Sequence, residues 1–453
     1  MTSSSSSPSP SSWEEVDGEI IMKVPNKFMN FPLGFATDAG ASITKLAYRS
    51  KKDYNKGQLI TPSDYGLLRL RIFKMADVCQ IVDFLKENCD VMETGNGSGF
   101  ENVTWYMTGV ITQHFKAKLE EEFGIKTKLC SEVLGIQEIV KVSSDIKLGC
   151  YELDSKAFNL ATARVQMMAK AINKVLVLES NRQEADDFKR KNDCCVCASG
   201  EELKESEISQ TSSNSNFKGP VMELLSTANY AEWAEKYLKS SSNQFVAQSL
   251  FVLFGSATVV LLADEEFNMK GVDFSGAAGK TLSGLVEEML HLQDFDEFIK
   301  MAERGNMNKV NGLMSDLKNC EHREEDWYSF FPDDYPTFEL GKLTTANAKG
   351  KGIYTKDDLA AGILNFQASS LSKFAFHNCC IHKVDRVYFC GSLMKYDVAR
   401  SMIATNFLTE SFWHSLEGVG LMKPFFVHQP GFLVVLGLWA DNVKLTKLMT
   451  DNF

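Results

Sequence analysis

A short stretch near the start of the chain decides the fold: residues 33–48 read LGFATDAGASITKLAY. Two strand-like runs flank a turn of small residues, a pattern that predicts a β-hairpin. Its tip carries a carboxylate, a glycine, a hydroxyl and an ammonium, from Asp38, Gly40, Ser42 and Lys45. Backbone N–H groups, hydroxyls and lysines bind phosphate oxygens, and carboxylates hold Mg²⁺, so the tip has the parts of an ATP site. The alternative is an ordinary hairpin turn with an Asx cap.

The whole chain has the composition of a globular protein. Of its 453 residues, 44% are hydrophobic and 24% charged, which excludes a globally disordered or fibrous chain. The net charge of −11 argues against a broad nucleic-acid surface or an anionic-membrane binder. The 11 cysteines are an odd number and no secretory signal is visible, so we expect a cytoplasmic protein. The longest apolar run, residues 250–263, is too short for a membrane span.

Polar segments divide the chain. Residues 1–18 are Ser/Pro-rich and then acidic, and we expect them to form a disordered tail. Residues 181–220 read as a polar insertion or linker. The ranges between them, 19–180 and 221–453, mix strand-like alternation with amphipathic helical spacing, and predict an N-terminal and a C-terminal α/β lobe.

Two helices can be placed by their local signals. Val78, Ile81, Val82 and Leu85 follow the i, i+3, i+4, i+7 stripe of an amphipathic helix. A similar stripe over residues 295–302 follows a candidate N-cap at Asp294 and precedes a helix-ending Gly305.

Two further apolar runs end abruptly in small residues. Residues 251–254 meet Gly255–Ser256, and residues 387–390 meet Gly391. A strand that runs into glycine places backbone N–H groups at a sheet edge, where phosphate binds. The sequence therefore predicts two more phosphate-binding turns.

Residues 276–281 read GAAGKT and look like a Walker A phosphate loop. The first glycine that this motif requires would fall at position 274, which is Phe274. We therefore do not expect this segment to bind nucleotide as a Walker A loop.

In order along the chain, these motifs resemble those of the eukaryotic-type (type II) pantothenate kinases, members of the actin/hexokinase/heat-shock-ATPase superfamily. The family's opening hairpin reads roughly G-M-D-I-G-G-T-L-V-K-L-V-Y, and residues 36–48 keep its Asp, first Gly, hydroxyl and Lys. Residues 107–115 resemble A-T-G-G-G-A-Y-K-F and keep the Thr-Gly pair that ends at Gly109. The colinear resemblance covers about residues 31–142 and 245–440.

The C-terminal matches are similar in kind. Residues 252–263 resemble V-N-x-G-S-G-V-S-I-L-A-V, and residues 384–392 resemble I-D-R-V-V-F-V-G-N. Residues 428–432 look like H-E-G-Y-F. Residues 274–285 align with G-T-S-L-G-G-G-T-F-L-G-L.

The resemblance implies a two-lobed actin/hexokinase-like α/β fold, with ATP in the cleft between the lobes. It implies phosphorylation of pantothenate, the first step of coenzyme A biosynthesis, with Mg²⁺ held by Asp38 through water. Glu132 would be the catalytic base, although a one-residue slip in the alignment would place Ser131 there. The residues implied for ATP binding are Gly40, Ser42, Lys45, Gly109, Gly255, Ser256 and Gly391. The family also implies a homodimer and acyl-CoA as a feedback ligand.

The chain departs from the family pattern at several positions. The family has an Arg, implied in substrate and acyl-CoA binding, where this chain has Gly271, and the neighbouring Lys270 would substitute as a point charge. Family glycines are replaced at Ala41, Val110 and Ala257, and each replacement adds a Cβ where backbone should approach phosphate. The alternative function is thus a catalytically inactive relative that binds nucleotide or acyl-CoA and acts in regulation. A third is a different small-molecule kinase on the same fold.

Overall fold

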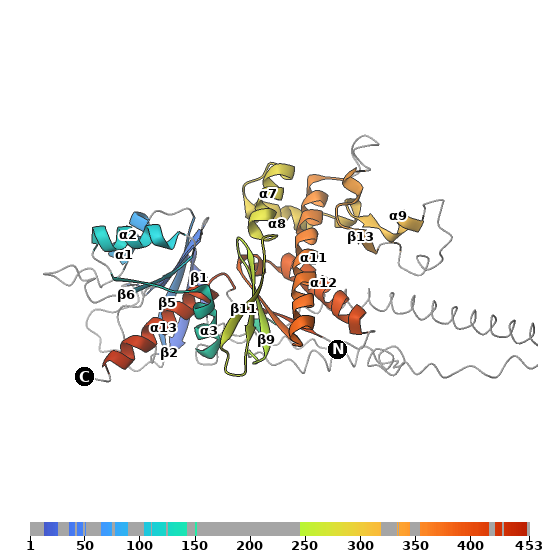
Figure 1. The fold of residues 1–453 in the computed structure, drawn as a ribbon. Coiled ribbons are helices and arrows are strands. Elements are labelled where there is room, and N and C mark those ends of the chain that lie inside the picture. Colours follow the sequence, from blue (N-terminus) through green and yellow to red (C-terminus); the bar gives the residue numbers. More distant parts are fainter. Residues whose placement is uncertain are drawn as a thin grey trace, which may run out of the picture.

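The protein is seen as a computed structural model (Figure 1). The residues that it describes are 13–25, 36–40, 43–48, 50, 65–74, 78–88, 104–109, 111–123, 126–142, 150–151, 245–318, 333, 335–344, 354–415, 422–427 and 430–450. The expected insertion at 181–220 and the position Ser42 lie outside these residues.

A seven-stranded sheet with the order β1-β2-β5-β4-β3-β6-β7 forms the N-terminal lobe. Its strands are β1 (Trp13–Val16), β2 (Glu19–Pro25), β3 (Ala36–Ala39), β4 (Ile43–Tyr48), β5 (Tyr65–Lys74), β6 (Thr104–Thr108) and β7 (Lys126–Leu129). Strands β3, β4 and β5 form an antiparallel meander, and β6 and β7 continue from β3 in parallel. Helices α1 (Val78–Asn88) and α2 (Thr112–Phe123) pack on the outer face, where the predicted stripe of α1 is buried.

A six-stranded sheet with the order β11-β10-β9-β14-β15-β8 forms the C-terminal lobe. Its strands are β8 (Cys150–Tyr151), β9 (Ser249–Phe254), β10 (Thr258–Ala263), β11 (Met269–Ser275), β14 (Arg386–Cys390) and β15 (Lys423–Val427). Helices α7 (Gly279–Leu290), α8 (Phe295–Arg304), α11 (Lys356–His382) and α12 (Asp397–Ser415) cover its outer face. As predicted, the side chain of Asp294 caps α8 by accepting the N–H groups of Asp296 and Glu297, and Gly305 ends the helix.

Smaller elements complete the C-terminal lobe. They are η5 (Met307–Lys309), β12 (Gly312–Leu313), α9 (Met314–Lys318), β13 (Pro336–Phe338) and η7 (Ser392–Lys395).

Both sheets follow one plan. In each, three antiparallel strands form a meander, and its first strand pairs in parallel with a fourth strand that pairs in parallel with a fifth. The meander of β9, β10 and β11 thus repeats that of β3, β4 and β5. This duplication confirms the two-lobed α/β fold of the actin/hexokinase class.

The lobes are joined by two helices that lie between the sheets, α3 (Glu132–Val142) and α13 (Leu433–Thr450). Helix α13 follows the last strand of the C-terminal sheet, yet it packs on α3 and on β3, β4 and β6 of the N-terminal sheet, as Figure 1 shows. Helix α3 also contacts β11. Both helices and both sheets contribute to one buried core, with members such as Leu70, Ile139, Phe251 and Trp439.

The structure corrects two of the expected boundaries. Residues 13–16, placed in the disordered tail, form β1, which pairs with β2 across Asp17 and Gly18. Both turn residues have positive φ, 52° and 75°, as a type I′ hairpin requires, so the Asp-Gly signal prevails over the acidic composition. The lobes also exchange elements, because β8 joins the C-terminal sheet and α13 covers the N-terminal one.

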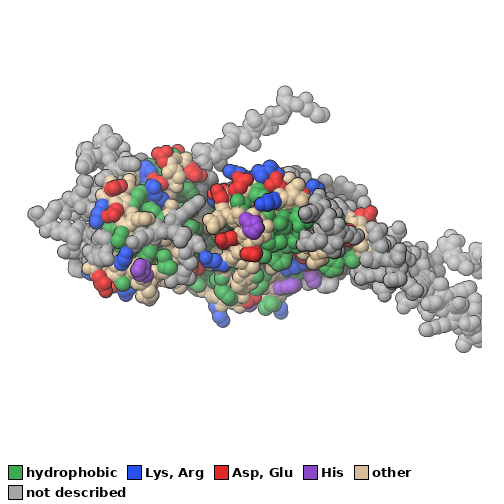
Figure 2. All heavy atoms as spheres, turned by 90° about the horizontal axis from the view of Figure 1, so that it is seen from above, with side chains coloured by type: hydrophobic (Ala, Val, Ile, Leu, Met, Phe, Trp, Pro, Cys, Tyr) green, Lys and Arg blue, Asp and Glu red, His purple; other side chains and the backbone are tan. Residues whose placement is uncertain are grey.

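The surface agrees with the acidic composition. On the face seen in Figure 2, acidic and basic side chains are interspersed over the described residues, without a broad basic area. No helix in the described part of the chain has the length and apolar character that crossing a membrane requires.

Helices α3 and α13 meet at glycines. A Cβ on Gly437 would lie 1.6 Å from the carbonyl oxygen of Gly135, and a Cβ on Gly135 would lie 2.5 Å from that of Val434. The two backbones are therefore in direct contact, at a distance that any side chain would increase.

We expect Gly437→Ala to destabilise the protein by about 2 kcal/mol or more, because the helices must separate to admit the methyl group. The free energy of unfolding is measured by urea denaturation. Gly284→Ala in α7 is the matched control, since a methyl group at Gly284 would have nothing within 4 Å. Helix propensity alone should leave that variant unchanged or more stable by up to about 1 kcal/mol. Equal stabilities of the two variants would contradict the role given to the crossing.

Candidate active site

The tip of the first hairpin holds an ion pair. Asp38 of β3 and Lys45 of β4 are cross-strand partners, and the ammonium of Lys45 donates to a carboxylate oxygen of Asp38 at 3.0 Å. Asp38 is 9% exposed and alternates with Thr37 and Ala39, so it lies on the same strand face as Ala36. Because Ala36 belongs to the core between the lobes, the ion pair faces that side of the sheet.

Glu132 is brought to this ion pair by helix α3. It is the first residue of the helix, and it is exposed to solvent. Desolvation by the protein atoms around the carboxyl group, and then the negative charge of Asp38, raise its pKa, while Lys45 opposes the shift. The neighbouring Ser131 caps the helix, because its hydroxyl accepts a hydrogen bond from the N–H of Leu134 at 3.1 Å.

Two glycines close the strand ends in the same way. Gly109 follows β6 with φ of 105°, and a Cβ there would lie 2.3 Å from the carbonyl oxygen of Ala39 at the end of β3. Gly391 follows β14 with φ of 111°, and a Cβ there would lie 2.0 Å from the carbonyl oxygen of Phe254 at the end of β9. Both the positive φ and the close approach require glycine.

The hairpin turns beside these glycines are also alike. The N–H of Gly40 donates to the carbonyl of Ile43 at 3.0 Å, and the N–H of Gly255 donates to the carbonyl of Ala257 at 2.9 Å. Each turn thus stands at the end of the first strand of its meander, β3 in one lobe and β9 in the other. The structure therefore brings together Gly40 with Gly109 in one lobe, and Gly255 with Gly391 in the other.

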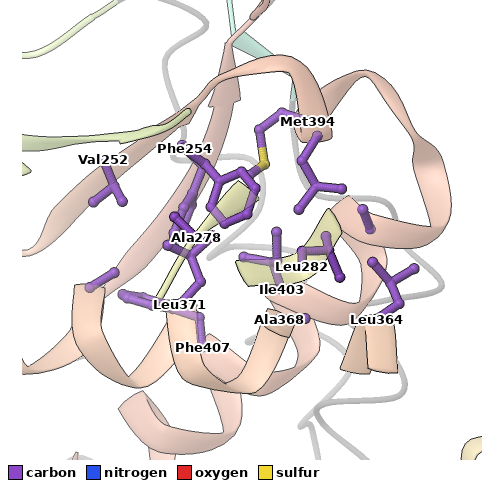
Figure 3. Close-up of a cluster of buried hydrophobic side chains, with 14 of the residues drawn as sticks. Val252, Phe254, Ala278, Leu282, Leu364, Ala368, Leu371, Met394, Ile403 and Phe407 are labelled. Carbon is purple, nitrogen blue, oxygen red and sulfur yellow. The ribbon is translucent and has the colours of Figure 1, made fainter. Parts of the chain in front are cut away.

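Helix α7 begins against the second turn. The N–H of Gly279 donates to the carbonyl of Gly255 at 3.0 Å, and the N–H of Lys280 donates to that of Ser256 at 3.2 Å. A hydrophobic cluster lies directly below, with Phe254 at the end of β9 beside Ala278 and Leu282 (Figure 3). The turn and the helix start therefore form one rigid unit.

Lys270 lies away from the residues at the Gly255 turn. In the register of the β10–β11 hairpin it pairs with Leu262, whereas Thr258 is the residue next to the Gly255 turn. Leu262 packs against the core of the outer face, so Lys270 lies on that face and near the far end of the hairpin. Adjacency in the sequence to a phosphate motif does not fix which face of a strand a side chain occupies.

Sequence reasoning also missed two residues beside the second turn, Gly279 and Lys280. Both belong to the GAAGKT segment, which lacks the first glycine of a Walker A loop. The segment is indeed not such a loop, because the Thr281 hydroxyl donates to the carbonyl of Gly276 at 3.0 Å. Its glycine and lysine nevertheless lie at the site.

Comparison with known proteins agrees with this geometry. Residues 223–441 match the family model described as Fumble. The chain is 23% identical over 203 residues to pantothenate kinase 2 of Arabidopsis thaliana, a match that covers 43% of this chain and 20% of that protein. This chain is a relative of the pantothenate kinases. The resemblance found in the sequence is thereby confirmed, although the hairpin and Glu132 lie outside the residues that the family model matches.

Two further known proteins are similar to this chain. The chain is 24% identical over 219 residues to 4'-phosphopantetheine phosphatase of Mus musculus, covering 46% of the chain and 25% of that protein. It is 21% identical over 196 residues to pantothenate kinase of Schizosaccharomyces pombe, covering 42% and 44%. The chain therefore spans less than half the length of each of these proteins.

Solved structures with a similar course of the chain include two nucleotide complexes. One is the activator of 2-hydroxyisocaproyl-CoA dehydratase from Clostridium difficile with bound ADPNP, with 9% identity, a TM-score of 0.39, and coverage of 92% of this chain and 97% of that one. The other is a ROK family glucokinase from Streptomyces griseus with glucose and AMPPNP, with 8% identity, a TM-score of 0.38, and coverage of 91% and 99%. The fold assignment rests on the sheet topology and not on these scores.

We expect Asp38→Asn to lower the pKa of the Glu132 carboxyl, because the substitution removes the negative charge that raises it. Lys45→Met should raise the same pKa, since it removes the charge that lowers it. Both values are measured by NMR titration of protein labelled with ¹³C at the glutamate carboxyls. Shifts in the same direction for both variants would show that Glu132 does not sense this ion pair.

Proposed function

We propose that this chain is an ATP- and Mg²⁺-dependent pantothenate kinase that catalyses the first step of coenzyme A biosynthesis. The observation that carries the proposal is the Asp38–Lys45 ion pair on the face between the lobes, with Glu132 at the start of α3 near enough for both charges to act on its carboxyl group. The relationship to pantothenate kinases supports pantothenate as the substrate. We extend to this chain the homodimer, the acyl-CoA feedback ligand and the cytoplasmic location that the family implies.

The two glycine-closed turns are proposed to bind the ATP phosphates. Gly40 and Gly109 contribute one turn, and Gly255 and Ser256 contribute the other, with adenosine beside Gly391. Because the N–H groups of Gly40 and Gly255 are engaged inside the turns, the remaining backbone N–H groups of each turn would bind the phosphates. Lys45 offers its ammonium to the phosphates, and Ser42 offers its hydroxyl.

Asp38 fits a Mg²⁺ site. Its carboxylate supplies the hard oxygen ligands that Mg²⁺ prefers, and Mg²⁺ in kinases is commonly held by one or two carboxylates together with water and phosphate. The described residues contain no group of three or more His, Cys, Asp or Glu that could hold a metal by themselves. When bound, Mg²⁺ neutralises charge on the β- and γ-phosphates.

Glu132 is proposed as the general base. The primary hydroxyl of pantothenate forms a bond to the γ-phosphorus while the bond from that phosphorus to the ADP oxygen breaks, and the hydroxyl proton passes to the Glu132 carboxylate. The raised pKa makes this carboxylate a better proton acceptor than an ordinary glutamate. Because only the ionised carboxylate accepts a proton, activity should rise with pH through a pKa above 4.5.

A second candidate is the inactive relative that binds nucleotide or acyl-CoA and acts in regulation. The observation in its favour is the missing family Arg at Gly271, together with the place of Lys270 on the outer face. A relative named as a phosphatase shows that this sequence family includes other chemistry.

We expect the purified chain to phosphorylate pantothenate with Mg-ATP, and Glu132→Gln to reduce kcat by about 10²–10⁴-fold while ATP binding is retained. Formation of phosphopantothenate is measured with labelled pantothenate between about pH 4 and 9, where the variant should also lose the acid limb of the profile. Glu138→Gln, on the same helix, is the control and should behave as wild type. Nucleotide binding without turnover in the wild type would favour the regulatory candidate, and an unaffected Glu132→Gln variant would remove Glu132 from the mechanism.

We expect Asp38→Asn to abolish the Mg²⁺ dependence of nucleotide binding or turnover, because the amide has lost the charge that attracts the cation. The affinity for AMPPNP is measured by calorimetry with Mg²⁺ and with EDTA. Wild-type Mg²⁺ dependence in this variant would refute the metal role of Asp38.

A further inference from the structure

The GAAGKT segment is held rigidly in place next to the second turn. The N–H of Ala277 donates to the Ser275 hydroxyl at 3.2 Å, and the Gln367 amide of α11 donates to the carbonyl of Ala277 at 3.1 Å. With the bond between Thr281 and Gly276 described above, three contacts fix the path from β11 into α7. These contacts hold the backbone of the segment beside the second turn.

Gly279 fixes the distance between α7 and the turn. A Cβ at this position would lie 2.5 Å from the carbonyl oxygen of Gly255, so only glycine permits the contact. The next residue, Lys280, is held by its own N–H on the carbonyl of Ser256. The backbone of Lys280 is thus hydrogen-bonded to the turn that is proposed to bind phosphate. The flexible side chain of Lys280 is long enough to reach a phosphate bound at that turn.

The charge of Lys280 has no protein partner there. The side chain is exposed, and Lys280 makes no ion pair with any residue among those described. Its neighbours one helical turn later are Ser283 and Gly284, and the first turn of α7 contains no acidic residue. A cation in the first turn of a helix is repelled by the positive end of the helix dipole, so Lys280 is placed where its charge does not favour the fold.

Lys280 departs from the family pattern quoted in the sequence analysis. In the alignment of residues 274–285 with G-T-S-L-G-G-G-T-F-L-G-L, Lys280 stands at the third glycine of the triplet. The Arg that the family has upstream is Gly271 here, and Lys270 lies on the outer face. Lys280 is therefore a cation gained beside the turn in a chain that lacks the expected one.

We propose that Lys280 is a phosphate-binding residue, whose ammonium contacts the phosphates of ATP at the Gly255–Ser256 turn. This inference rests on the proposed binding of ATP between the lobes. Its ammonium would neutralise phosphate charge, which is a main part of catalysis in phosphoryl transfer. A lysine contributes this as a point charge, without the paired geometry of an arginine.

The test compares the full-length chain with Lys280→Met, Lys280→Arg and the control Lys300→Met, which removes another exposed lysine from α8. Calorimetry measures the affinity for Mg-AMPPNP and, separately, for adenosine, and pantothenate turnover is measured in parallel. We expect Lys280→Met to weaken AMPPNP binding by about 10- to 100-fold, as for the loss of a charged hydrogen bond, and to leave adenosine binding unchanged. Lys280→Arg should restore most of the affinity, and Lys300→Met should match wild type.

The outcomes separate the two proposals. Wild-type affinity for AMPPNP in Lys280→Met, in a chain that binds nucleotide and phosphorylates pantothenate, overturns the role of Lys280 and leaves the proposed function standing. An equal loss of adenosine affinity also overturns it, because adenosine has no phosphate. A wild-type chain that does not bind AMPPNP overturns both. Thermal unfolding of each variant verifies that the substitutions leave the fold intact.

Discussion

The backbone contact between Gly135 and Gly437 is the constraint on which the arrangement of the candidate site depends. It sets the separation of α3 and α13 where they cross between the sheets. Glu132 begins α3 one turn before Gly135, and α13 packs on the strands that carry Asp38 and Lys45. The position of Glu132 relative to the strands of the ion pair therefore depends on two residues that have no side chain.

The two lobes repeat the same arrangement of strands and turns. In each lobe the first strand of the meander, β3 or β9, ends in a hairpin turn, and a glycine of positive φ after the adjacent parallel strand, β6 or β14, packs against that strand end. Because the close approach involves backbone atoms only, the turns keep the same form although their sequences differ. Among the glycines that this chain shares with the family pattern, Gly109 and Gly391 are two that leave no room for a side chain, and both turns are retained although other family glycines are replaced.

The sequence predicted what local signals encode. The hairpin of Asp38 and Lys45, the stripe of α1 and the cap at Asp294 are short-range patterns, and all three are present. The exchange of α13 between lobes was not predictable, since an apolar helix shows no preference for one sheet over another. Lys270 was misplaced for a related reason: the alignment gave its position along the chain, whereas the strand register decides its face. Lys280 was overlooked because neither of the two patterns compared with its segment, the Walker A motif and the family's glycine-rich stretch, assigned it a role.

The exchanged helix also bears on how the protein is made. The N-terminal sheet is complete in strands once β7 is synthesised, yet its inner face is covered by α13, whose first residue is Leu433. Domains of a growing chain usually fold in order as they leave the ribosome. Here the first lobe emerges before the helix that packs on β3 and β6, strands whose residues Ala36 and Tyr106 belong to the core between the lobes. The nascent chain therefore exposes apolar surface of this sheet through most of its synthesis, and exposed apolar surface is what chaperones bind.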